Sequence, residues 1–150
     1  MRATNHVLTG ALIGATISLP AVALPAALAS HFILDALPHF GGENHRSKVF
    51  LVELIFDALL ALLFLATLYN RQPHNWLLMA GCGILAASPD LMWLPRYIKE
   101  LKLGRKLKRP MNIINRFHSR IQWSERPYFW WIEFVWATAT LTYLVIFNKI

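Results

Sequence analysis

The sequence predicts an all-α integral membrane protein, a helical bundle of four or five apolar helices with a basic interfacial helix. Two observations lead to this fold class. Hydrophobic residues make up 56% of the 150 residues, and the mean hydropathy is +0.41. These residues also occur in long blocks, which is typical of membrane-spanning segments. A chain of this length suits one domain, so we expect residues 1–150 to form a single transmembrane helical domain.

The first two apolar blocks, 6–19 and 25–38, are shorter than the about 20 residues that cross a bilayer. Pro20 ends the first block, whereas Pro25 suits the first turn of the second, which Pro38 ends. We expect a hairpin that turns at "SLPAVALP", because two prolines five residues apart disrupt a continuous helix. The alternative is that the two blocks join into one span.

The blocks 48–69, 76–95 and 128–147 are each long enough to span a bilayer. Within the second of these blocks, the small residues of "AGCGILAA" allow helices to approach closely. The single Cys82 lies in that run, so neither a disulfide framework nor a thiolate metal cluster is expected. Signal-peptide cleavage at "AALAS" is not expected either, because it would truncate the helix that follows.

The basic residues are distributed very unequally between the two sides of the membrane. In the hairpin arrangement, all of the 15 Lys and Arg residues except Arg71 and Lys149 fall on one side. The positive-inside rule places that side in the cytoplasm, so we expect an inner (plasma) membrane protein. Trp93, Trp123 and Trp130 cluster at the same boundary, as interfacial aromatic residues do.

The segment "RYIKELKLGRKLKRP" (96–110) interleaves Lys and Arg with Ile and Leu. This pattern is typical of a helix that lies on an anionic leaflet, with Gly104 as a possible break, and each basic residue contributes about 1 kcal/mol near the surface. We expect membrane lipids with anionic headgroups as partners, although the charges could simply fix the topology. Nucleic acid is not expected, because the nearby aromatic residues are placed as membrane anchors.

Titratable side chains gather on the same basic side. His31 and Asp35 are four residues apart and share a helical face, as do Glu53 and Asp57. Carboxylates at membrane depth are costly and usually face a partner or a water-filled cavity. A divalent cation would offset this cost, and helical bundles build such sites from side chains that project inward. The sequence therefore predicts a metal centre at the cytoplasmic mouth of the bundle.

The expected metal ligands, in order of preference, are His31, Asp35 and Asp90, followed by His6 and His118. Zinc is the expected metal, with manganese or iron as alternatives, because imidazole and carboxylate ligands suit all three. Glu53 or Asp57 would be a further ligand or the general base. The competing interpretation is that His31 and Asp35 bond to each other while the other acids pair with Lys and Arg.

Three other histidines are weaker candidates. His39 follows Pro38, which ends the helix and moves His39 off its face. His45 lies in the polar loop "GGENHRSK", and His74 falls on the opposite side of the membrane.

Several stretches together resemble a known family. They are "NHVLTGALIG", the helix that ends in His31 and Asp35, the pair His45–Arg46, the acidic third block and "ASPDL". Over about residues 5–95 they are similar to the LexA-regulated, inner-membrane-associated metal-dependent hydrolases. The resemblance implies a small multi-span membrane hydrolase with metal ligands at His6, His31, Asp35 and Asp90.

The chain departs from the family pattern after His45–Arg46, where "SKVF" stands in place of a Thr-His-Ser run. One histidine that the family pattern contains is therefore missing. His118, in "RFHSRIQW", is a candidate to replace it.

These observations predict a metal-dependent hydrolase that acts on a lipid or another phosphoester. The sequence has no nucleophile elbow, P-loop or dinucleotide fingerprint, which disfavours a serine hydrolase. The second hypothesis is a non-catalytic membrane protein, either a metal or proton carrier or a structural bundle. A carrier needs polar groups across the whole membrane, and the far halves of the spans ("LLALLFLATL", "LTYLVIF") are almost purely apolar.

Overall fold

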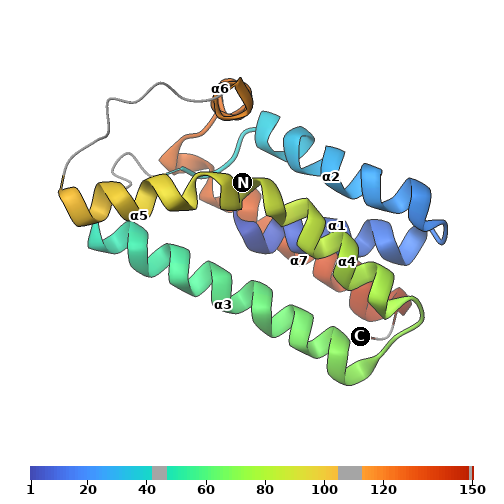
Figure 1. Ribbon diagram of the computed structural model, residues 1–150. Coiled ribbons are helices and arrows are strands. Elements are labelled where there is room, and N and C mark those ends of the chain that lie inside the picture. The colour runs from blue at the N-terminus through green and yellow to red at the C-terminus, as the bar shows by residue number, and fades with distance from the viewer. Residues whose placement is uncertain (42–46, 105–112, 149) are drawn as a thin grey trace.

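The computed structural model describes residues 1–41, 47–104, 113–148 and 150, and these residues form helices and no strand. The elements, in chain order, are α1 (Ala3–Thr16), α2 (Pro20–Ala36), α3 (Lys48–Arg71), α4 (Trp76–Ala87), the 3₁₀-helix η1 (Ser88–Met92), α5 (Leu94–Leu103), α6 (Ile113–Ile121), the 3₁₀-helix η2 (Pro127–Phe129) and α7 (Trp130–Asn148). They pack into one bundle (Figure 1), which confirms the all-α fold class.

Three helical segments are long and apolar enough to cross a membrane, namely Lys48–Arg71, Trp76–Leu103 and Pro127–Phe147. Their apolar side chains mostly face outward, since only 17%, 28% and 17% of the respective windows are buried. Several polar side chains are buried instead, among them those of Asn5 and Asp57. Apolar residues outside and polar residues inside are the arrangement that a lipid environment favours.

The first two helices form the predicted hairpin. α1 ends at Thr16, α2 begins at Pro20, and the two helices contact each other. The predicted start of the second helix was wrong by five residues, because Pro20 occupies its first turn and Pro25 lies inside it. A proline costs little in the first turn, where the N–H has no intrahelical partner, so the helix can begin at the earlier proline.

The block 76–95, expected as one helix, is not a continuous α-helix. α4 stops at Ala87 and η1 follows, and Pro89 at this point cannot donate an intrahelical hydrogen bond. α5 then ends at Leu103 and is capped by Gly104, whose φ of +62° suits glycine, so the predicted break is confirmed. Residues 105–110 of the basic segment lie outside the described residues.

α1 lies at the centre of the bundle and contacts α2, α3, α4 and α7 (Figure 1). Its approach to α4 is very close. A Cβ atom added at Gly10 would lie 2.3 Å from the carbonyl oxygen of Cys82, and one added at Gly14 would lie 2.7 Å from that of Leu78. The small-residue run of the fourth block therefore does allow a neighbouring helix to approach, as predicted.

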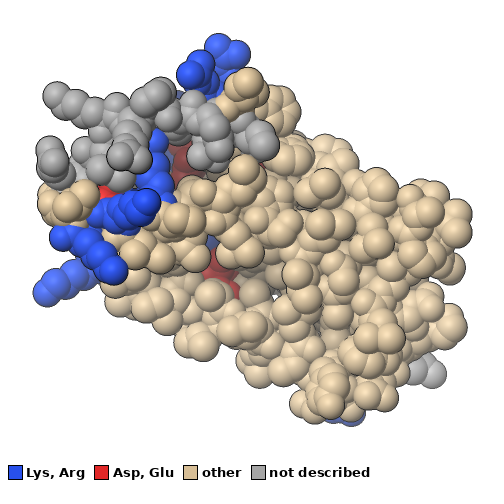
Figure 2. Space-filling view, viewed as in Figure 1, with Lys and Arg blue, Asp and Glu red and all other residues tan. Residues whose placement is uncertain are grey.

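The bundle has two chemically different ends. The N-terminus, the start of α3, and α5 and α6 lie at one end, whereas the α1–α2 turn, the α3–α4 turn and the C-terminus lie at the other (Figure 1). Lys and Arg side chains gather at the first end, and most of the remaining visible surface is formed by uncharged residues (Figure 2). We call this first end the basic end.

We expect Gly10→Ala to destabilise the bundle by about 1–3 kcal/mol, because the added methyl group meets backbone atoms of α4 that cannot move aside. Thermal unfolding of the purified protein in detergent measures the effect. Gly81→Ala is the matched control, because a Cβ there comes no nearer than 4.0 Å to Leu24. Equal melting of the two variants would contradict close packing of α1 on α4.

Candidate metal centre

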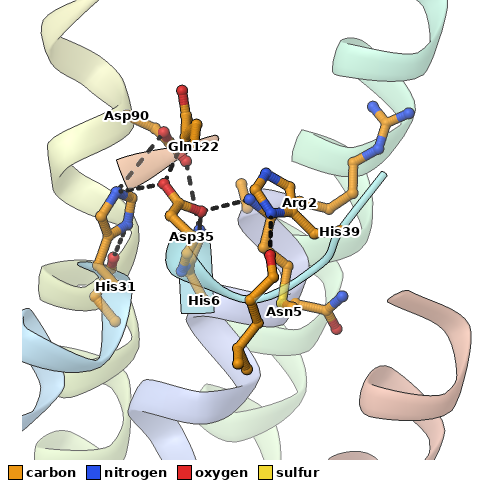
Figure 3. Close-up of polar contacts among 12 residues, drawn as sticks. Arg2, Asn5, His6, His31, Asp35, His39, Asp90 and Gln122 are labelled. Carbon is orange, nitrogen blue, oxygen red and sulfur yellow. Dashed lines mark hydrogen bonds and ion pairs between the residues drawn. The ribbon is translucent and has the colours of Figure 1, made fainter. Parts of the chain in front are cut away.

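Four elements bring the predicted ligands together at the basic end (Figure 3). They are α1 with His6, α2 with His31 and Asp35, η1 with Asp90, and α6 with His118. All five side chains that the sequence analysis named as ligands therefore lie in one cluster, which we call the His/Asp cluster.

Asp35 lies at the centre of the cluster, and its side chain is fully buried. Its Oδ2 atom lies 2.8 Å from Nε2 of His118 and 3.3 Å from Nε2 of His31. Its Oδ1 atom lies 3.1 Å from Nε2 of His6 and also accepts a hydrogen bond from the amino group of Met1. A buried carboxylate without partners would cost several kcal/mol, so these contacts are what make the position tolerable.

Asp90 approaches the cluster from η1. Its Oδ1 atom lies 3.9 Å from Nε2 of His31 and 3.8 Å from Nε2 of His118. The Asp90 side chain is 19% exposed, whereas those of His31 and Asp35 are fully buried. Asp90 is therefore the more exposed of the two carboxylates of the cluster.

The spacing of these groups fits a divalent cation. One ligand atom each from His31, Asp35, Asp90 and His118 can be chosen so that all four lie within 4.8 Å of one another. Zinc binds nitrogen and oxygen at about 2.0–2.2 Å, so two ligand atoms on a tetrahedral ion lie about 3.3–3.6 Å apart. The Nε2 atoms of His31 and His118 are 3.1 Å apart, close to that separation.

The orientation of His31 also suits a metal ligand. Its Nδ1–H donates to the carbonyl oxygen of Ala86 at 2.8 Å, which fixes the ring and leaves Nε2 directed at the cluster. Metal-binding imidazoles almost always donate their second ring nitrogen to a carbonyl or carboxylate in this way. The close packing of α1 and α2 against α4 brings this carbonyl within reach.

Gln122 is a member of the cluster that the sequence analysis missed. Its side-chain amide donates to Oδ2 of Asp35 at 3.2 Å and lies 3.4 Å from Nε2 of His118. Gln122 follows directly after α6, and its backbone N–H donates to the His118 carbonyl at 3.3 Å, so the i and i+4 side chains of His118 and Gln122 lie on one face. The sequence analysis had not predicted the short helix α6 in the connecting segment, so Gln122 was not placed beside His118.

Glu53 and Asp57, predicted as ligand or general base, have other partners. Glu53 accepts a hydrogen bond from the Arg2 guanidinium at 2.9 Å. Asp57 accepts from the backbone N–H groups of Ala3 at 2.8 Å and of Thr4 at 3.2 Å. It thereby satisfies the free amides at the positive end of α1, which is a favourable place for a carboxylate. The structure does not bring these two acids into the group of four ligand atoms.

Glu133 has a role similar to that of Asp57. Its carboxylate accepts from the Arg2 backbone N–H at 3.2 Å and from the Asn5 side chain. Two acids from two spanning helices therefore hold the first turn of α1, and this turn carries His6 toward the cluster.

The three histidines that the sequence analysis ranked as weaker candidates lie outside the group of four ligand atoms or outside the described residues. α2 ends at Ala36, and the Nδ1–H of His39 donates to the Leu37 carbonyl at 2.8 Å. Burial, reinforced by the nearby N-terminal charge, lowers the pKa of His39 to about 4, so the ring is neutral near pH 7. His74 lies in the α3–α4 turn, and His45 falls outside the described residues.

Comparison of the chain with models of protein families, with curated proteins and with solved structures finds no match. The resemblance to the LexA-regulated hydrolases therefore stays a prediction.

We expect Asp57→Ala to lower the stability of the bundle by about 1–2 kcal/mol, because two amides at the start of α1 lose their acceptor. Glu53→Gln should cost less than about 1 kcal/mol, because its pair with Arg2 is partly exposed. Thermal unfolding in detergent and the metal content of both variants are the measurements. If Asp57→Ala lost bound metal without losing stability, Asp57 would be a ligand and not a helix cap.

Proposed function

We propose that the protein is a membrane-bound metal-dependent hydrolase whose His/Asp cluster binds a divalent cation at the membrane boundary. The observation that carries the proposal is the convergence of His31, Asp35, Asp90 and His118, with ligand atoms within 4.8 Å of one another. Zinc is the metal we favour for this mixed set, and manganese or iron would also suit it.

The side chains of the cluster would have different roles in such a site. His31, His118 and Asp35 would hold the cation, with the Ala86 carbonyl fixing His31 and the Gln122 amide steadying Asp35. Asp90, the only one of the two acids with exposed surface, would be the acid that meets a substrate or water. When bound, the cation supplies Lewis-acid polarisation of the scissile group and activates water near neutral pH.

We propose a phosphoester carried by a lipid, or another anionic phosphoester, as the substrate. α5 and α6 present basic side chains at the same end as the cluster (Figure 2), and those whose positions are described are Arg96, Lys99, Lys102, Arg116 and Arg120. Exposed apolar side chains accompany them, among them Ile98 and Phe117. Basic and apolar residues on one surface attract an anionic leaflet, and α6 connects that surface to the cluster through His118.

The orientation follows from charge alone. We propose that the basic end faces the cytoplasm and that the membrane is the inner (plasma) membrane, because positively charged segments are retained on that side.

A structural role is the second candidate function. Asp35 already accepts hydrogen bonds from the Met1 amino group, from a cluster histidine and from Gln122. The same contacts that fit a metal centre could therefore act only as a polar junction that ties α1, α2 and α6 together. Metal content separates the two candidates.

We expect the protein, purified in detergent without chelator, to contain at least one divalent metal ion per chain by elemental analysis. His31→Ala and Asp35→Ala should each remove most of it, because each deletes a ligand from the buried set. His74→Ala is the matched control, since it deletes an exposed histidine at the opposite end. Metal-free wild-type protein that melts cooperatively would favour the structural junction.

We expect Lys99→Gln combined with Lys102→Gln to raise the KM for an anionic phosphodiester lipid in mixed micelles by about 30-fold. Each exposed lysine contributes about 1 kcal/mol of attraction to an anionic surface. The kcat should stay within about twofold, because neither lysine belongs to the cluster. Arg71→Gln, at the opposite end, is the control for net charge. An unchanged KM across a range of salt concentrations would contradict substrate capture by this surface.

A further inference from the structure

The two carboxylates of the cluster each direct their two oxygen atoms at different histidines. For Asp35, Oδ2 is the oxygen near His31 and His118, at 3.3 and 2.8 Å, whereas Oδ1 is the oxygen near His6, at 3.1 Å. Asp90 repeats the division, with Oδ1 near His31 and His118 at 3.9 and 3.8 Å and Oδ2 near His6 at 3.9 Å. The cluster therefore has two sides that share both acids.

The His6 ring stacks on that of His31, yet His6 is not one of the four residues whose ligand atoms group together. Its Nε2 atom is not among the four ligand atoms within 4.8 Å of one another. Two atoms bound to one zinc ion at about 2.0–2.2 Å cannot be more than about 4.4 Å apart. The same cation is therefore poorly placed to bind His6 together with the full set of four.

We propose that the cluster binds two divalent cations bridged by Asp35 and Asp90. The first position is formed by His31 and His118, and the second lies on the side of His6. This inference rests on the metal centre of the proposed function and adds the number of ions to it. In two-metal sites the ions lie about 3.5–4 Å apart, a separation that bridging carboxylates maintain.

The second position already holds one positive charge. The amino group of Met1 lies against Oδ1 of Asp35, the same oxygen that His6 contacts, so a cation bound there would take the place of this ammonium group. The His6 side chain is fully buried, and its ring stacks on that of His31 with centroids 4.1 Å apart. Two divalent cations against two carboxylates give a net positive centre, which suits an anionic phosphoester held between them.

The two positions should differ in affinity. His31 is fixed by its hydrogen bond to the Ala86 carbonyl, whereas Nδ1 of His6 has no hydrogen-bond partner among the described residues. An imidazole without this second hydrogen bond is a weaker and less well oriented ligand. The first cation should therefore bind at the His31–His118 position, and the second should bind less tightly.

The test is a Mn²⁺ titration of the full chain in detergent after chelator treatment, followed by elemental analysis and electron paramagnetic resonance. We expect two Mn²⁺ ions per chain in the wild type, bound in two steps, with the spectrum of a spin-coupled pair at saturation. His6→Ala should bind one ion with an uncoupled spectrum, because only the second position loses a ligand. His74→Ala should still bind two coupled ions.

One uncoupled Mn²⁺ ion per chain in both wild type and His6→Ala would overturn the second position while the proposed metal centre stands. No bound Mn²⁺ in the wild type would overturn both. The stoichiometry and spectrum of the wild type decide the question even if His6→Ala fails to fold.

Discussion

The buried carboxylate of Asp35 is the constraint around which the rest of the structure is arranged. A charge with no exposed surface is tolerated only with several close partners, because its desolvation costs several kcal/mol. Those partners come from α1, from α2 itself and from α6, up to 87 residues away along the chain. Each of these helices therefore has a contact with one of the two carboxylate oxygens of Asp35.

Four of the acids at the basic end form two pairs with different partners, which their sequence positions do not distinguish. Asp35 and Asp90 face imidazoles, whereas Asp57 and Glu133 face the amides at the start of α1. The second pair supports the first indirectly. By holding the first turn of α1 between two spanning helices, Asp57 and Glu133 fix the helix that carries His6, and the glycines of α1 fix its depth against α4.

The sequence predicted the helices and the members of the cluster better than the contacts of each member. Block length and proline positions predicted the hairpin and the spans, because apolar periodicity and missing N–H groups act locally. The partners of Asp57 could not be predicted, since the amides of Ala3 and Thr4 lie 54 and 53 residues away in the chain. An acid four residues from another acid suggests a shared site, yet Glu53 and Asp57 bind different groups.

The hydrogen bond between His118 and Asp35 spans 83 residues, and this separation has a consequence for biogenesis. A ribosome completes α1 and α2 long before it makes α6, so in the nascent hairpin Asp35 has Met1, His6 and His31 as partners but not yet His118. Docking of α6 against the hairpin is therefore a late step of maturation.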